Sequence, residues 1–512
     1  MKNKVYANAS IVTGLSIAER GLGFLYRIVL SRLIGAEGMG LYQVALSFFA
    51  LFLTIGSGGI PITVSRIITK SKAENNRLGE SGAVSAGGIA SIILTLPICI
   101  IFGIWGGKMR FLFTDERTFS VFRILLLGLT CTSIYAVIRG HFWGNKQFLA
   151  PSIMELSEEI VMVIAGVLLL QNVTSPASGA RLAAWAVVIS YFFSFTLSTI
   201  WFFVKGGRLS SPEKQLKPLF TSSLPITSVR ASASLINSAI AVLLPVMLIR
   251  AGFDEREALR LFGVVSGMVL PILFVPSTLI GSLSLVLVPE LSEDFYRKNY
   301  KRLYHNLSRG LKFAFFTACA IIPFFFGLGE DFGAIVFSNP TAGQMIKNSC
   351  WILLPMSVSM ISTAMLNSLG FEKQTFGFYF IGAAVTFACI FLLPKYCGGY
   401  AYLIGLGLCY LATAVCNLIF LFKKCPIYKK QWGQVCVHEY LPTLLVTLLL
   451  SLSATVFHKF FQYFSGAILS MIFTALLLTV ESFLAYLVTG TIRLKEIHTF
   501  LQNKKTPFAK KK

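Results

Sequence analysis

The feature that most constrains the fold is a succession of long apolar segments separated by short charged or Gly/Pro-rich breaks. A transmembrane helix needs about 20 predominantly apolar residues, and each segment reaches that length. The sequence predicts about fourteen such helices, at residues 7–33, 41–69, 81–105, 119–139, 149–171, 180–204, 219–250, 259–288, 305–328, 344–369, 374–394, 398–422, 437–458 and 463–490. The breaks are too short for a soluble domain. We therefore expect an all-α polytopic membrane protein.

Composition supports this assignment and excludes other classes of protein. Hydrophobic residues make up 55% of the chain and charged residues 13%, whereas soluble domains are about 25% charged. A net charge of +23 would suggest a nucleic-acid partner in a soluble protein, but in a membrane protein it reflects cytoplasmic loops. The ten cysteines form no CxxC pair and the five histidines are scattered, so no metal site and no nucleic-acid partner are expected.

The basic residues predict how the chain is oriented. With an even number of spans, both termini lie on one side of the membrane. If the N-terminus is inside, 29 basic residues fall in inner segments, including the tail from Arg493 to Lys512, and 11 in outer segments. This asymmetry is the one that the positive-inside rule requires. We expect a protein of the cytoplasmic membrane with both termini in the cytoplasm.

A weak internal repeat suggests two lobes. The stretch "IGAEGMGLYQVALSFFALFL" after the first span resembles "AGFDEREALRLFGVVSGMVLPIL" after the seventh, with Leu41-Tyr42 and Leu261-Phe262 in matching places. Repeats of this kind are typical of transporters. The predicted organisation is an N-lobe of six helices at 1–204, a C-lobe of six helices at 205–424, and two further helices with a basic cytoplasmic tail at 425–512.

Several arginines lie within predicted spans, where a basic group costs about 2.5–3.5 kcal/mol on insertion scales. Arg20 is about 20 Å into the first helix, at 1.5 Å per residue, and Arg27 follows roughly two turns later on the same face. Arg66 lies in the second span and Arg230 in the seventh, just after Pro225. If the lobes are related by a two-fold axis, Arg20 and Arg230 face each other across a central cavity.

A guanidinium group is always charged and binds phosphate oxygens in a bidentate manner. We therefore predict that Arg20, Arg27, Arg66 and Arg230 bind an anionic, phosphorylated cargo. The alternative is a structural ion pair between helices, for example between Arg20 and a glutamate of the fifth span. This alternative is favoured for Arg123.

Three glutamates of the fifth span, Glu155, Glu158 and Glu159, follow an i, i+3, i+4 pattern that predicts one shared helix face. They could be counter-ions for the arginines or a site for a coupling ion, Na⁺ or H⁺. They could also be ordinary charges at the cytoplasmic end of the helix. No other cofactor is indicated, and the membrane potential is a further source of energy.

Prolines interrupt three of the predicted spans. Pro61 follows the sequence "GSGG", Pro271 and Pro276 lie within "GMVLPILFVP", and Pro225 lies in the seventh span. Because transporter helices can bend where a proline frees backbone carbonyls, we predict hinges at these positions.

At these residues the chain resembles a known family. The segments "RGLGFLYRIVLSRLIGAEGMGLYQ" (Arg20–Gln43), "GGIPITVSRI" (Gly58–Ile67), "PSIMELSEEIV" (Pro151–Val161) and "GMVLPILFVPSTLIGSLSLVLVPELSE" (Gly267–Glu293) are similar to those of the stage V sporulation protein B group of polysaccharide-exporter flippases. That group belongs to the multidrug/oligosaccharidyl-lipid/polysaccharide (MOP) superfamily, with the lipid II flippases and the MATE antiporters.

The resemblance implies a MATE/MOP-like transporter, not an enzyme, that flips an undecaprenyl-diphosphate-linked saccharide by alternating access. The cargo would be a peptidoglycan precursor or a related polysaccharide unit, for example for the spore cortex, with membrane lipids and the cell-wall synthesis machinery as partners. Arg20 matches the first-span arginine of the family directly. Relatives often carry an arginine where this chain has Met162, which leaves Glu158 and Glu159 without a nearby partner.

Two other functions remain open from the sequence. A MATE-like antiporter of organic cations would require acidic and aromatic residues in its cavity. A membrane-embedded glycosyltransferase would use the same lipid-linked sugar, with acids such as Glu330 and Asp331 on the outer side. No large outer loop surrounds those acids.

Overall fold

The computed structural model describes residues 2–108, 113–424, 440–464 and 466–488, and this part of the chain forms helices and no strand. Within it, eleven helices are long and apolar enough to cross a membrane, or up to twelve if the bent pair α4 (Glu116–Leu126) and α5 (Leu129–Gly144) is one span. The first of these, Ile11–Ala73, is 63 residues long and contains two of the predicted spans. The all-α polytopic fold is confirmed, and the prediction of about fourteen helices is close to what is observed.

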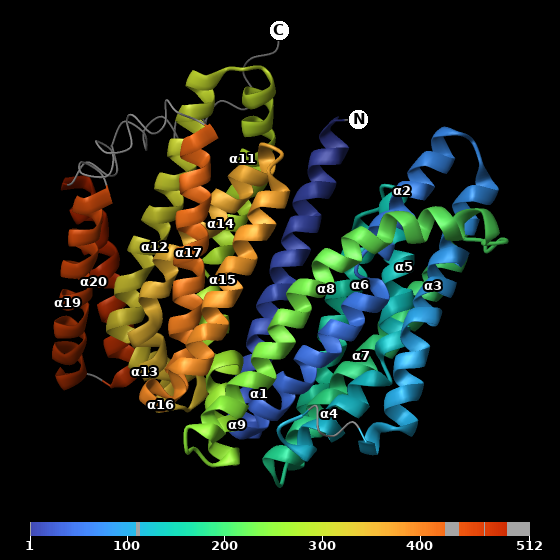
Figure 1. The fold of residues 1–512 in the computed structure, drawn as a ribbon. Coiled ribbons are helices and arrows are strands. Elements are labelled where there is room, and N and C mark those ends of the chain that lie inside the picture. Colours follow the sequence, from blue (N-terminus) through green and yellow to red (C-terminus); the bar gives the residue numbers. More distant parts are fainter. Residues whose placement is uncertain (1, 109–112, 425–439, 465, 489–512) are drawn as a thin grey trace. The chain divides into compact units, whose positions relative to one another are not determined.

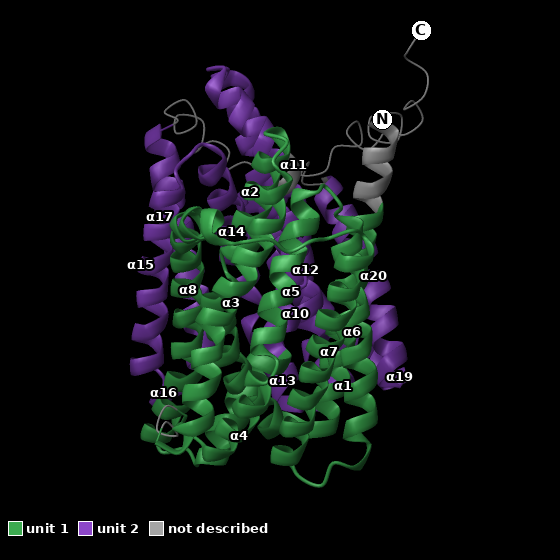
Figure 2. Ribbon diagram, turned by 90° about the vertical axis from the view of Figure 1, so that its right-hand side faces the viewer, with its two compact units in different colours: residues 1–268 green, residues 269–512 purple. Residues whose placement is uncertain are grey.

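The chain divides into two compact units, residues Met1–Met268 and Val269–Lys512, shown in green and purple in Figure 2. The boundary falls inside a π-helical stretch, η3 (Val264–Val269). Helices α8 (Glu213–Arg250) and α9 (Glu255–Gly263) therefore group with unit 1. The basic tail predicted at Arg493 to Lys512 lies outside the described residues.

Unit 1 is built around its first helix, α1. The remaining helices of the unit are α2 (Ile60–Ala73), α3 (Arg77–Ile104), α4, α5, α6 (Leu149–Leu169), the short η2 (Leu170–Asn172), α7 (Pro176–Val204), α8 and α9. Helix α1 (Lys2–Ser57) packs against α6, α7, α8 and α9, and α2 packs against α3 and α5 (Figure 1). Ile60, Val64 and Ile68 on α2 pack in one buried cluster with Tyr135 and Phe142 on α5.

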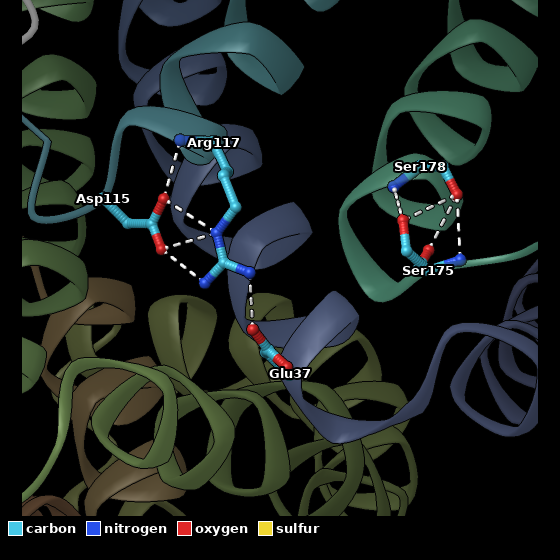
Figure 3. Close-up of polar contacts among 5 residues, drawn as sticks. All are labelled: Glu37, Asp115, Arg117, Ser175 and Ser178. Carbon is cyan, nitrogen blue, oxygen red and sulfur yellow. Dashed lines mark hydrogen bonds and ion pairs between the residues drawn. The ribbon is translucent and has the colours of Figure 1, made fainter.

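Helix α1 is two helices joined at Gly35, whose φ of 70° is unfavourable for residues with a Cβ atom. Just after this turn, the Glu37 carboxylate accepts a hydrogen bond from Nη1 of Arg117, at 2.6 Å. The same guanidinium donates to both carboxylate oxygens of Asp115, which caps the N-terminus of α4 (Figure 3). The turn is thus fixed to α4. Figure 3 also shows Ser175 and Ser178, the reciprocal cap that begins α7.

Helices α1 and α9 cross at two glycines. A Cβ atom on Gly40 would overlap the carbonyl oxygen of Leu259, and one on Gly263 would overlap that of Ala36. Only glycine fits where two backbones approach this closely. The two segments that the sequence analysis matched as a repeat therefore pack directly against each other.

Unit 2 is organised around α12 (Tyr300–Phe337). The other described helices are α10 (Leu270–Phe274), α11 (Ser277–Tyr296), α13 (Pro340–Ser349), η4 (Cys350–Ile352), α14 (Leu353–Ser368), α15 (Glu372–Leu392), α16 (Pro394–Cys397), α17 (Tyr400–Lys424), α19 (Leu441–Phe464) and α20 (Ala467–Val488). Helix α12 contacts α11, α13, α14, α19 and α20. Its buried residues Leu307 and Leu311 pack with Ile361 and Met365 of α14 in the core.

The prolines predicted as hinges occupy different local structures. Pro61 is the second residue of α2, directly after a break in the span, and Pro271 is the second residue of α10, directly after the π-helical stretch. Pro276 precedes α11. Pro225 lies inside α8, which continues through it. Motion at these positions remains a prediction.

Candidate functional site

The second span is broken, and α8 supplies hydrogen-bonding partners for the break. The first part of the span ends at Ser57 and α2 begins at Ile60, leaving Gly58 and Gly59 between them. Nη1 of Arg230 donates to the carbonyl oxygen of Gly58 at 2.9 Å, and the N–H of Gly59 donates to Oγ1 of Thr227 at 3.0 Å. Unpaired backbone groups are costly inside a membrane, so these two contacts stabilise the break.

A row of polar side chains on α8 extends this contact along α1. The hydroxyl groups of Ser234 and Thr54 lie 2.9 Å apart, and the Ser238 hydroxyl donates to the carbonyl oxygen of Ser47 at 2.7 Å. Thr227, Arg230, Ser234 and Ser238 are three or four residues apart, which places them on one helix face. Arg230 was predicted as a site residue, whereas the hydroxyl groups were not; their spacing is the signal of their shared face.

The three glutamates of α6 are directed to three different helices. Glu155 accepts a hydrogen bond from Nη1 of Arg139 on α5, at 2.8 Å. Glu158 faces the hydroxyl group of Ser194 on α7. Glu159 lies against Gly23 on α1, where a Cβ atom would meet its Oε1. The predicted shared face therefore separates into three environments, because α6 packs against α5, α7 and α1.

Arg27 is half-buried and interacts electrostatically with Glu159 and Tyr42. This corrects the expectation that Glu159 has no nearby cation when Met162 replaces an arginine. Arg139 is the last residue of the predicted fourth span, 119–139. The structure places it in α5, where its guanidinium also lies over the ring of Trp143, 5.0 Å from the centroid.

Arg20 and Arg66 are exposed on α1 and α2. Among the residues that the structure describes, neither side chain forms a hydrogen bond or an ion pair, although Glu19 interacts electrostatically with its neighbour Arg20. The alternative of a pair between Arg20 and a glutamate of α6 is not observed, since Glu155 bonds to Arg139 instead. Arg230 is also exposed, apart from its bond to Gly58. Three guanidinium groups of unit 1 are thus accessible.

Several buried polar atoms of unit 1 lack a hydrogen-bond partner within the described part of the chain. They include the hydroxyl groups of Tyr26 and Tyr135, Nε of Arg139, and Oε2 of Glu158. Such atoms normally bind ordered water. The described residues contain no group of three or more His, Cys, Asp or Glu side chains arranged to hold a metal ion.

Comparisons with known proteins identify the family. Residues 5–295 match the family described as polysaccharide biosynthesis protein. The chain belongs to this family. Stage V sporulation protein B of Bacillus subtilis (strain 168) is 23% identical over 400 residues, which are 75% of this chain and 76% of that protein. Lipid II flippase MurJ of the same organism is 25% identical over 367 residues, which are 67% of this chain and 66% of that protein.

Solved structures of other proteins share the fold of this chain, and two of them show the degree of similarity. The lipid II flippase MurJ in an inward closed conformation has a TM-score of 0.71 at 14% identity, covering 95% of this chain and 99% of that chain. An inward-facing MATE family transporter of the MOP superfamily has a TM-score of 0.66 at 15% identity, covering 80% and 96%. The MATE/MOP-like fold and the resemblance to the sporulation protein group are confirmed, and the chain is a multi-pass membrane transporter rather than an enzyme.

Proposed function

We propose that the protein moves an undecaprenyl-diphosphate-linked saccharide outward across the cytoplasmic membrane by alternating access. The cargo is a peptidoglycan precursor or a related polysaccharide unit. Membership of a polysaccharide biosynthesis family, and sequence similarity to a lipid II flippase, support this class of substrate. Similarity to a sporulation protein supports a role in the spore cortex, with the cell-wall synthesis machinery as partner.

The observation that carries the proposal is the set of accessible guanidinium groups on apolar helices. Arg20 and Arg66 are exposed. Arg230 is also exposed and donates one hydrogen bond, to the carbonyl oxygen of Gly58. A diphosphate carries the charge and the oxygen geometry that a guanidinium fork binds best. We assign these three arginines to the diphosphate, while Arg27 interacts with Glu159. The sugar follows the diphosphate, and the lipid tail remains in the bilayer.

Energy for transport would come from an ion gradient or from the membrane potential, which is worth about 2.3 kcal/mol per elementary charge at 100 mV. Glu158 is the best candidate for a site that binds Na⁺ or H⁺. Its Oε2 has no hydrogen-bond partner among the described residues, and the hydroxyl group of Ser194 lies beside it. Glu155 and Glu159 already interact with arginines. We place both chain termini in the cytoplasm.

The test is flipping of a lipid-diphosphate saccharide in proteoliposomes by the wild type, Arg20→Ala and the matched control Arg123→Ala. Arg123 is also an exposed arginine of an apolar helix, and its guanidinium lies 6.0 Å from the centroid of the Phe119 ring. We expect Arg20→Ala to lose flipping and Arg123→Ala to keep it. Normal flipping by Arg20→Ala would contradict the assignment of the arginines.

Cation antiport, the MATE-like alternative, is favoured by one observation, the unpartnered carboxylate oxygen of Glu158. The same proteoliposomes separate the two functions. Uptake of a fluorescent organic cation that depends on Glu158, without flipping of any lipid-linked saccharide under imposed ion gradients and membrane potential, would favour antiport.

A further inference from the structure

Unit 2 presents a basic face on the first turns of α12, which the proposed transport does not use. Its side chains recur at intervals of three, four or seven residues, so they lie on one side of the helix. The other side packs in the core of the unit through Leu303, Leu307 and Leu311. The members of the basic face are Lys301, Arg302, His305, Arg309 and Lys312.

The basic face carries positive charge that α12 itself does not compensate. Lys301, His305 and Arg309 are exposed, and none of their side chains forms a hydrogen bond or an ion pair with a described residue. From Tyr300 to Gly329, α12 contains no acidic residue. An anionic ligand would therefore meet no carboxylate of α12 beside this face.

The acids of α11, the helix that precedes α12, neutralise only a small part of the face. Glu293 lies 3.1 Å from Nη2 of Arg297, which is outside the face. Asp294 is buried and lies 3.5 Å from Nε of Arg302, so it compensates one member. Glu290 is exposed and forms no bond to the face within the described part of the chain. Most of the positive charge therefore remains.

The last basic residue of the face marks the membrane boundary. Residues 313–329 contain no charged side chain, and at about 1.5 Å per residue they are roughly 25 Å long, close to the hydrocarbon core of a bilayer. Arg309 lies about one turn, or about 6 Å, outside this stretch, which is the level of the lipid phosphate groups. The face continues outward with the α11–α12 turn, which extends past the ends of α15 and α17 (Figure 1).

Exposed apolar side chains lie just below the basic face. Phe313, the next residue after Lys312, is 43% exposed. The ring of Phe316 packs on that of Tyr486, with 4.6 Å between the centroids, so the end of α20 lies beside this part of α12. One turn before Tyr486, α20 exposes Phe483. Positive charge at the phosphate level, above exposed apolar side chains, suits both ends of a phospholipid.

We propose that the basic face binds the headgroup of an anionic phospholipid of the cytoplasmic leaflet, whose acyl chains lie against Phe313 and the end of α20. Arg309 binds the phosphate oxygens, because a guanidinium fork donates two parallel hydrogen bonds to such a group. The other basic side chains attract the headgroup electrostatically. An acidic protein would contact the charges but not the apolar side chains beneath them.

The test is lipid binding by the purified full-length protein, measured by native mass spectrometry. The probes are phosphatidylglycerol and phosphatidylcholine with the same acyl chains, which differ in the charge of the headgroup. We expect the wild type to prefer phosphatidylglycerol and Arg309→Gln to bind it about fivefold more weakly, the effect of one basic residue near an anionic lipid. Arg309→Lys should retain most of the affinity. Equal binding of both lipids by the wild type, or an unchanged affinity in Arg309→Gln, would overturn the proposal.

Lys373→Gln is the matched control. It removes one exposed charge at the start of α15, on the same side of unit 2, since Phe371 two residues before it contacts Phe295 of α11. Its affinity for phosphatidylglycerol should equal that of the wild type. A loss as large as that of Arg309→Gln would mean that net charge, not the basic face, attracts the lipid. If Arg309→Gln does not fold, Lys301→Gln takes its place, and an unchanged affinity there contradicts the proposal.

Undecaprenyl diphosphate separates the two sources of a lipid-borne phosphate. Binding of this lipid at Arg309 without binding of phosphatidylglycerol would make the face a site for the cargo and overturn the proposal. Arg20→Ala, which is expected to lose flipping, should keep its affinity for phosphatidylglycerol. The proposed transport and the proposed lipid site can therefore fail independently of each other.

Discussion

Arg230 donates a hydrogen bond from Nη1 to the carbonyl oxygen of Gly58, 2.9 Å away, at the point where the second span is broken. A guanidinium group has five N–H donors, so this contact leaves donors for an anion. An anion that draws Arg230 away from Gly58 also removes a partner from the break. The residue predicted to bind cargo is thus in contact with the break in the second predicted span.

The first prediction concerns the fork of Arg230. Arg230→Lys keeps the positive charge. An ammonium group lacks the several N–H donors of the planar guanidinium, so it cannot bind the Gly58 carbonyl oxygen and a diphosphate at the same time in the same geometry. We expect initial flipping rates to fall about tenfold, equivalent to about 1.4 kcal/mol, the size of one charge-assisted hydrogen bond. Rates in proteoliposomes measure this, with Arg123→Lys as the control. A wild-type rate for Arg230→Lys would show that charge alone is sufficient.

The second prediction concerns the hydroxyl group that accepts from Gly59. Thr227→Val preserves shape but leaves the N–H of Gly59 without its partner, so we expect a loss of about 1–3 kcal/mol in the free energy of unfolding. Thr227→Ser keeps the acceptor and should lose much less. Denaturant unfolding in detergent distinguishes the two. Equal destabilisation by valine and serine would mean that the methyl group, not the hydroxyl, is what stabilises the break.

A third prediction addresses the ion pair between Arg139 and Glu155. Both side chains are about one-quarter exposed, and Nη1 lies 2.8 Å from Oε1. A double-mutant cycle with Arg139→Gln and Glu155→Gln should give a coupling energy of about 1.5–3 kcal/mol, typical of a hydrogen bond between charged groups. The matched cycle with Glu159→Gln, whose carboxylate interacts with Arg27 on α1, should give a smaller value. The reverse order would contradict the observed pairing.

The fourth prediction tests the crossing of α1 and α9. Gly40→Ala forces a Cβ atom into the carbonyl oxygen of Leu259, and overpacking of this kind costs about 1–3 kcal/mol or more. Gly88→Ala on α3 is the control, because nothing lies within 4 Å of the new Cβ atom there. Alanine at that position should be neutral or stabilising, since glycine weakens a helix. Unfolding midpoints for the two variants provide the comparison.

Hydropathy predicted the helical architecture well, because length and apolar content are enough to identify most spans. The fifth predicted span contains three glutamates and still forms a helix, α6, at 149–169, which packs mainly against α7 and α1. Gly35 lies just after the first predicted span, 7–33, and the turn there has a positive φ that glycine adopts readily.

The pairing of individual side chains was less predictable. Arg139 is the last residue of the predicted span 119–139, and only the packing of α5 on α6 brings it to Glu155. The spacing of Thr227 from Arg230 was a weak signal, because threonine is common in apolar helices. Oδ2 of Asp331 on α12 lies 2.7 Å from Nε2 of His458 on α19, 127 residues later, and nothing in either local sequence indicates the other. Such contacts follow from how helices pack, which periodicity alone does not specify.

The crossing at Gly40 and Gly263 has a consequence for the kinetics of any movement between α1 and α9. Interlocked side chains must change rotamers before two helices can roll over each other, and each change adds to the activation barrier. Here the contact is between backbone atoms, with no side chain on either glycine. A small rotation about this point needs no rotamer exchange, so its barrier is set by the surroundings of the two helices rather than by the crossing itself.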